Sequence, residues 1–224
     1  MVTLAEDLYL LASDGDTGRL LIDTTYLDRG LSGALLLELV LQRRVGSVDY
    51  HVTMSDSTPT GDPLLDTALA EVAGESKAHE PEYWVRHLAR GVRHAVQDRL
   101  VAEGVLRRDD HKVLGVIPVH RTPETDQRLH HELVDHLHDA VVLGHPPSRK
   151  TAALATLALA VGLEQHLFPR SDRRAVRHRM AEVAESGCAE GQWVGAAVRH
   201  TIDAVNAAMG ITPPPAYDEA GELG

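Results

Sequence analysis

Cysteine and aromatic residues are scarce in this sequence. Cys188 is the one cysteine among 224 residues, so no internal disulfide can form, which is typical of a reducing compartment. Aromatic residues make up only 4% of the chain against 43% apolar residues, so the core must consist of Leu, Ala and Val. Such a core favours helices over sheets.

Signatures of secretion and of catalysis are also missing. The first residues, MVTLAEDLYLLAS, have no basic segment before the apolar one, so the chain is not predicted to be secreted and we expect it in the cytoplasm. There is no G-x-S-x-G motif, because Gly30-Leu31-Ser32-Gly33 only approaches it and leads into an apolar helix. The loop at residues 55–63 lacks the Gly-Lys-Ser/Thr of a phosphate-binding loop. The sequence therefore predicts no enzymatic activity.

Histidine is abundant, with 14 residues, and invites a metal hypothesis. The helix HHELVDHLH resembles a zinc-protease helix, which needs two histidines four residues apart. Here His131 and His136 are five apart and would lie on different faces, so solvated histidines are the better interpretation. We expect no metal and no cofactor.

What is present is a strongly apolar stretch at residues 28–45, DRGLSGALLLELVLQRRV, with Glu38 as the only charge between Leu31 and Leu41. A helix that is apolar on nearly every side is packed on all faces. The stretch is shorter than the roughly 20 residues that cross a bilayer. It predicts the central helix of a water-soluble core, with Ser32 near the helix start.

The rest of the chain predicts a mainly α, single domain of buried central helices surrounded by amphipathic helices, with one or two small β-hairpins. Residues 149–168 are predicted to form a second buried helix. A strand or hairpin is expected at 45–54, and two short strands are expected around a polar turn at 107–112. We assign the domain to residues 1–211 and expect the acidic, proline-rich tail at 212–224 to be disordered.

Positive charge is concentrated although the formal net charge is −11. Residues 86–108 hold six arginines against two acidic residues, and residues 170–179 hold five against one. Arg86, Arg90 and Arg93 are four and three apart, which puts them on one face of a continuous helix. Such an array matches phosphate geometry, and the alternative is a set of surface salt bridges.

Two functional readings follow from this basic segment. The first is an anion site on an otherwise acidic body. The second is a winged-helix-like regulator that binds nucleic acid, because a helix is predicted at residues 83–103, with a kink at Gly91, and it precedes a small hairpin. The net charge of −11 and the lack of a continuous basic face argue against nucleic acid as a partner.

Several stretches resemble the Golgi phosphoprotein 3 family, in particular its actinobacterial branch, in agreement with a composition typical of a high-GC bacterium. They occur in the family's order and cover nearly the whole chain: LAEDLYLLASDGDTGRL, DRGLSGALLLELVLQRRV, SDSTPTGDPLLDTAL, YWVRHLARGVRHAVQDRLVAEGVL, RKTAALATLALAVGL and GQWVGAAVRHTI. The run PTGDPLLDTAL followed by RLVAEGVL is the most distinctive.

The resemblance implies a helical domain without catalytic activity. Eukaryotic members bind the head group of phosphatidylinositol 4-phosphate and recruit the cytoplasmic tails of glycosyltransferases. The expected partners are therefore an anionic phospholipid, either a phosphoinositide or a bacterial anionic lipid, and cytoplasmic tails of membrane proteins. The protein would be peripheral at the inner face of the plasma membrane, and a homo-oligomer is left open.

The family's head-group pocket carries over to this sequence only in part. Its two later arginines fall on Arg90 and Arg93, with Arg86 nearby. The arginine at the start of the central helix falls on Ser32, where free backbone N–H groups would favour an anion. The pocket's tryptophan falls near Asp23, whose carboxylate would repel a phosphate.

The resemblance also implies a membrane-inserting hairpin after the basic helix. In this sequence the hairpin tip is residues 113–119, VLGVIPV. An apolar tip beside cations is suited to the membrane interface. The alternative is that these side chains pack inward against the core or a neighbouring subunit. The residues expected to insert are Val113, Leu114, Val116, Ile117 and Val119.

Overall fold

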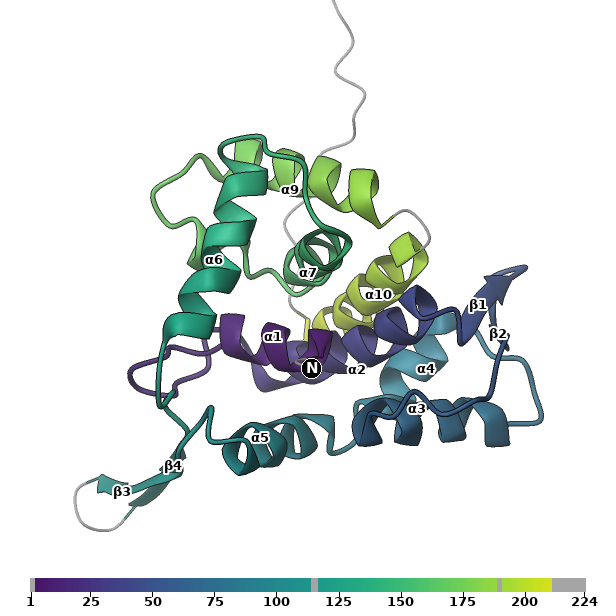
Figure 1. Ribbon diagram of the computed structural model, residues 1–224, viewed down its shortest axis with the longest axis horizontal. Helices are drawn as coiled ribbons and strands as arrows, with labels where there is room; N and C mark the ends of the chain where they lie inside the picture. Colours follow the sequence, from purple (N-terminus) through teal and green to yellow (C-terminus); the bar gives the residue numbers. More distant parts are fainter. Residues whose placement is uncertain (1–2, 114–116, 189–190, 211–224) are drawn as a thin grey trace, which may run out of the picture.

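The computed structural model describes residues 3–113, 117–188 and 191–210, and for residues 110–113 and 117–120 it describes the backbone alone. Within these residues the chain forms ten helices and two separate antiparallel hairpins, which confirms the predicted mainly α fold (Figure 1). The tail predicted to be disordered lies outside the described residues, so the domain boundary after residue 211 stays a prediction.

Helix α2 (Thr24–Leu41) is the buried centre of the fold, as predicted. Eleven of its 18 residues are buried, so it meets other helices on most sides. Its start was predicted four residues too late. The side chain of Asp23 accepts a hydrogen bond from the backbone N–H of Thr25 at 2.7 Å and caps the helix there. Ser32 consequently lies in the third turn and not at the helix start.

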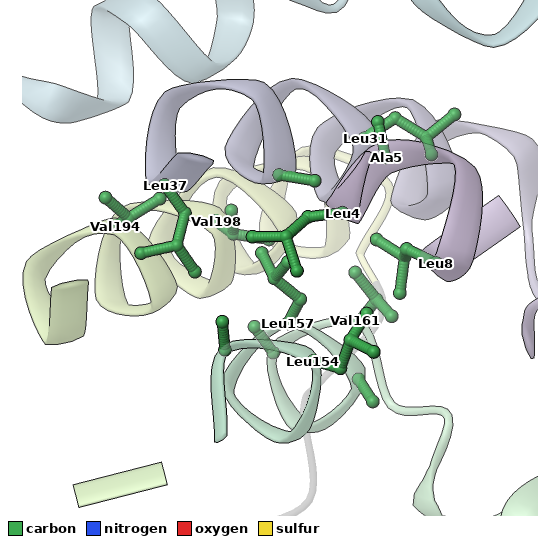
Figure 2. Close-up of a cluster of buried hydrophobic side chains, with 14 of the residues drawn as sticks. Leu4, Ala5, Leu8, Leu31, Leu37, Leu154, Leu157, Val161, Val194 and Val198 are labelled. Atoms are coloured by element: carbon green, nitrogen blue, oxygen red, sulfur yellow. The ribbon is translucent and has the colours of Figure 1, made fainter. Parts of the chain in front are cut away.

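Six helices pack around α2, and together they close the core (Figure 1). They are α1 (Leu4–Leu11), α3 (Pro63–Gly74), α4 (Pro81–Leu88), α5 (Val92–Ala102), α7 (Arg149–Ala160) and α10 (Gln192–Ala208). Figure 2 shows leucines of α1, α2 and α7 meeting valines of α10 in one apolar cluster. Gly33 lets α2 and α10 approach closely, since a Cβ atom there would lie 2.3 Å from Cγ2 of Val198.

The second basic segment, residues 170–179, lies beside carboxylates of the fold. It covers the start of α9 (Arg173–Gly187), which packs with α6 (Arg128–Val141) and α8 (Glu164–Leu167) near α7. The buried carboxylate of Glu164 lies 2.6 Å from Nη1 of Arg177 and 3.9 Å from Nη2 of Arg173. Part of the positive charge of this segment is therefore balanced by a carboxylate of the same fold.

The two hairpins lie at opposite ends of the molecule (Figure 1). Strands β1 (Val45–Val48) and β2 (His51–Met54) pair antiparallel, as predicted. After α5 (Val92–Ala102), strands β3 (Asp109–Val113) and β4 (Ile117–Arg121) pair from Asp109↔Arg121 to Val113↔Ile117. The polar turn predicted at residues 107–112 is wrong, because this register makes most of that segment a strand.

Candidate anion-binding site

A break at Gly91 separates the three arginines that a continuous helix would align. Gly91 has a φ of 74°, in the left-handed region, and stands between α4 and α5. Arg86 belongs to α4, Arg90 lies in the connection and Arg93 lies in the first turn of α5. The kink predicted at this glycine is confirmed, but the single helical face derived from the spacing is wrong.

A cavity of about 500 Å³ opens where α2 faces α4 and the connection to α5. Three of its lining side chains are arginines. Arg29 comes from α2, and Arg86 and Arg90 come from residues 81–91, which are α4 with the connection that follows it and are called the α4 segment below. The complete lining is Thr25, Asp28, Arg29, Tyr83, Arg86, His87, Ala89 and Arg90. The sequence prediction thus identified two of the three cavity arginines.

Arg29 is the cavity arginine that the sequence prediction missed. Its Nη1 donates to the backbone carbonyl of Arg86 at 3.2 Å, while its buried Nε has no hydrogen-bond partner among the described residues. Burial lowers the pKa of Arg29, and the positive charge of Arg86 lowers it further. The sequence held one signal that could have identified Arg29, because it precedes Ser32 by one helical turn and lies on the same helix face.

None of the three cavity arginines forms a salt bridge with a carboxylate in the part of the chain that the structure describes. Asp28 is the one acidic residue of the lining, and its Oδ1 accepts from Nε of Arg93 at 2.9 Å. Most of the positive charge in the cavity therefore lacks a compensating group. An anion would supply the missing charge.

Arg93 and Ser32, which the resemblance places in the head-group pocket, are not among the lining residues. Arg93 is occupied by Asp28, as described above. Ser32 is fully buried, and its hydroxyl lies 2.7 Å from the carbonyl oxygen of Val85 and 2.9 Å from that of Arg29. The hydroxyl proton of Ser32 is therefore hydrogen-bonded within the fold. The backbone N–H of Ser32 lies in the interior of α2 and not at the helix start.

Asp23 and the apolar hairpin are the remaining parts of the predicted site. Asp23 is exposed at the cap of α2 and does not line the cavity. Val113, Ile117 and Val119 lie in β3 and β4, where only the backbone is described. Leu114 and Val116 fall outside the described residues. The membrane role of this hairpin stays a prediction.

Together these features define a helical protein with an arginine-lined cavity between its central helix and the α4 segment. None of the described helices has the length and apolar character needed to cross a membrane. The family model of Golgi phosphoprotein 3 (GPP34) matches residues 4–205. The chain belongs to this family, and the match confirms the resemblance seen in the sequence.

Proposed function

We propose that this protein is a non-enzymatic, peripheral membrane protein that binds the anionic head group of a phospholipid in the arginine cavity. The observation that carries the proposal is that Arg29, Arg86 and Arg90 line one cavity without a carboxylate partner among the described residues. Guanidinium groups bind phosphate oxygens through paired hydrogen bonds, and these bonds are stronger than neutral ones.

The size and charge of the site fit this ligand class. A cavity of about 500 Å³ lies within the range of ordinary small-molecule sites. The formal net charge of −11 would repel an anionic membrane at long range, but it is screened beyond ~8–10 Å at physiological salt. Binding would therefore depend on the local arginines and on an approach of the cavity to the surface.

Family membership suggests the lipid and the partners. Phosphatidylinositol 4-phosphate is the ligand implied by the resemblance, and phosphatidylglycerol or cardiolipin would be bacterial substitutes. The hairpin of β3 and β4 would assist by inserting its apolar tip, at the inner face of the plasma membrane of a bacterium. Cytoplasmic tails of membrane proteins form the second partner class.

Co-sedimentation with vesicles tests the proposal. Phosphatidylcholine vesicles with and without phosphatidylglycerol or phosphatidylinositol 4-phosphate would be mixed with the wild type and with Arg29→Met, Arg86→Met and Arg90→Met. A hydrogen bond to a charged group contributes about 1.5–3 kcal/mol, so each variant should bind about ten-fold more weakly or worse. Binding by the wild type should also fall as salt rises.

Arg128→Met is the matched control. Arg128 lies at the start of α6 and is largely exposed, and its only ion pair among the described residues is with its neighbour Asp126. Its loss should leave vesicle binding unchanged. Equal pelleting of the wild type and a triple variant of the cavity arginines would refute the head-group site. Salt-sensitive binding to DNA, together with that result, would favour the winged-helix alternative.

A further inference from the structure

A second concave surface lies on the other side of α4. This groove, of about 760 Å³, is lined by α3, Trp84 and His87, and it contains three acidic residues, Asp66, Glu71 and Glu75. His87 is the one residue that lines both the groove and the arginine cavity. Its imidazole therefore separates a cationic space from an acidic one.

Three rings form a column along this wall. The ring of Tyr83 stacks on His79 at 3.7 Å between centroids and on His87 at 5.4 Å, with an interplanar angle of 13° in both pairs. Each histidine of the column has a carboxylate beside it. Nε2 of His87 lies 2.6 Å from Oε2 of Glu71, and Nε2 of His79 lies 3.7 Å from Oε2 of Glu75.

We propose that protonation of His87 controls the affinity of the arginine cavity for its anion. This inference rests on the function proposed above and adds its regulation. With a neutral imidazole the pair of His87 and Glu71 has a charge of −1, which opposes an anion bound next to it. With a protonated imidazole the charge of the pair is zero, so the anion is held more tightly.

Other charged groups around His87 also affect how the affinity for an anion changes with pH. Arg86 and Arg90 from the α4 segment and Arg29 from α2 stay charged throughout, and Asp28 is held by Arg93. On α10, His200 lies 2.9 Å from Glu82 near the start of α4. His79 and His200 would add smaller effects of the same sign, so a variant of His87 itself is required.

The window between pH 7.5 and 5.5 spans the ordinary titration range of histidine and lies above the ordinary range of side-chain carboxyls, near pH 4. The probe must keep a constant charge in this window. Vesicles with phosphatidylglycerol, a phosphodiester, meet this condition, and inorganic sulfate meets it as a free anion. Using both distinguishes a lipid head group from a free anion as the ligand.

The wild type should bind either probe about three- to ten-fold more tightly at pH 5.5 than at pH 7.5, at constant ionic strength. His87→Gln should remove most of this ratio, whatever its affinity at pH 7.5. His136→Gln, which changes an exposed histidine on α6, should keep the full ratio. Thermal unfolding at both pH values checks that each variant is folded.

A second measurement uses the wild-type protein and does not depend on the His87→Gln variant. If protonation strengthens anion binding, then sulfate must raise the pH midpoint of the His87 imidazole, which NMR can follow. A flat wild-type profile, an unchanged ratio in His87→Gln, or a midpoint that sulfate leaves in place would each overturn this inference while arginine-dependent binding persists. Loss of arginine-dependent binding at both pH values would instead overturn the proposed function, and the inference with it.

Discussion

The guanidinium of Arg93 donates its Nε–H to Oδ1 of Asp28 at 2.9 Å, and this contact joins the start of α5 to the central helix α2. Asp28 lines the arginine cavity, whereas Arg93 does not. The contact therefore cancels a negative charge that would otherwise face the proposed anion. We therefore expect Arg93 to support the proposed site through Asp28, without contact to the ligand.

Removal of Arg93 should therefore weaken anion binding indirectly. Arg93→Met leaves the carboxylate of Asp28 uncompensated beside the cavity, so binding to phosphatidylglycerol vesicles should fall several-fold. In the double variant Asp28→Asn/Arg93→Met, binding should return close to that of the wild type. Co-sedimentation of the four proteins forms a double-mutant cycle. A loss that Asp28→Asn does not rescue would show that Arg93 contacts the head group itself.

Ser32 allows the resemblance and the structure to be compared directly. Introducing the family's arginine with Ser32→Arg should destabilise the fold by several kcal/mol without improving lipid binding, because the position is fully buried between α2 and α4. Ser32→Ala should cost only about 1 kcal/mol, for one lost hydrogen bond. Urea unfolding measures both changes. Tighter vesicle binding by a stable Ser32→Arg protein would contradict this placement.

Gly33 should be needed for the contact of α2 with α10. Gly33→Ala gains about 1 kcal/mol of helix propensity, but its Cβ would lie 2.3 Å from Cγ2 of Val198, and overpacking typically costs 1–3 kcal/mol. We expect a net loss of stability in urea unfolding. In a Val198→Ala background the same substitution should be neutral or stabilising, and an equal cost in both backgrounds would exclude the clash as the cause.

Asp7 should make stability depend on pH. It is fully buried in α1, with Oδ2 at 2.6 Å from Nζ of Lys150. Burial raises the pKa of Asp7 by more than Lys150 lowers it. The folded state thus binds this proton more tightly than the unfolded chain, so the resulting stabilisation is present at low pH and is lost as pH rises through the folded-state pKa.

Asp7→Asn removes this dependence. The stability of the variant relative to the wild type should therefore increase from about pH 4 to pH 8 in urea unfolding. The pKa of Glu38 is also raised by burial and, to a smaller extent, by the charge of Asp7, so Asp7→Asn also removes the part of the Glu38 trend that depends on Asp7. A difference that stays constant with pH would show that Asp7 keeps its charge in the fold at no cost.

The sequence predicted those features that depend on local patterns. The apolar run at residues 31–41 is buried as expected, apart from Glu38 and Leu41, and Gly91 breaks the basic helix where a kink was predicted. The cavity required tertiary information. Helical spacing alone could not show that Gly91, with its positive φ, would break the helix so that Arg93 pairs with Asp28. It also could not show that Arg29, and not Arg93, would line the cavity beside Arg86. Both outcomes depend on how α2 packs against α4.

Arg29 and Arg86 are 57 positions apart in the chain, yet Nη1 of the first lies 3.2 Å from the carbonyl oxygen of the second. An anion held by both side chains would act as a reversible cross-link across that loop. Binding to the folded state alone raises its stability by mass action and restricts opening of the loop. Protein on a membrane would then resist proteolysis longer than protein released from it, so the lifetime of the protein would report its location.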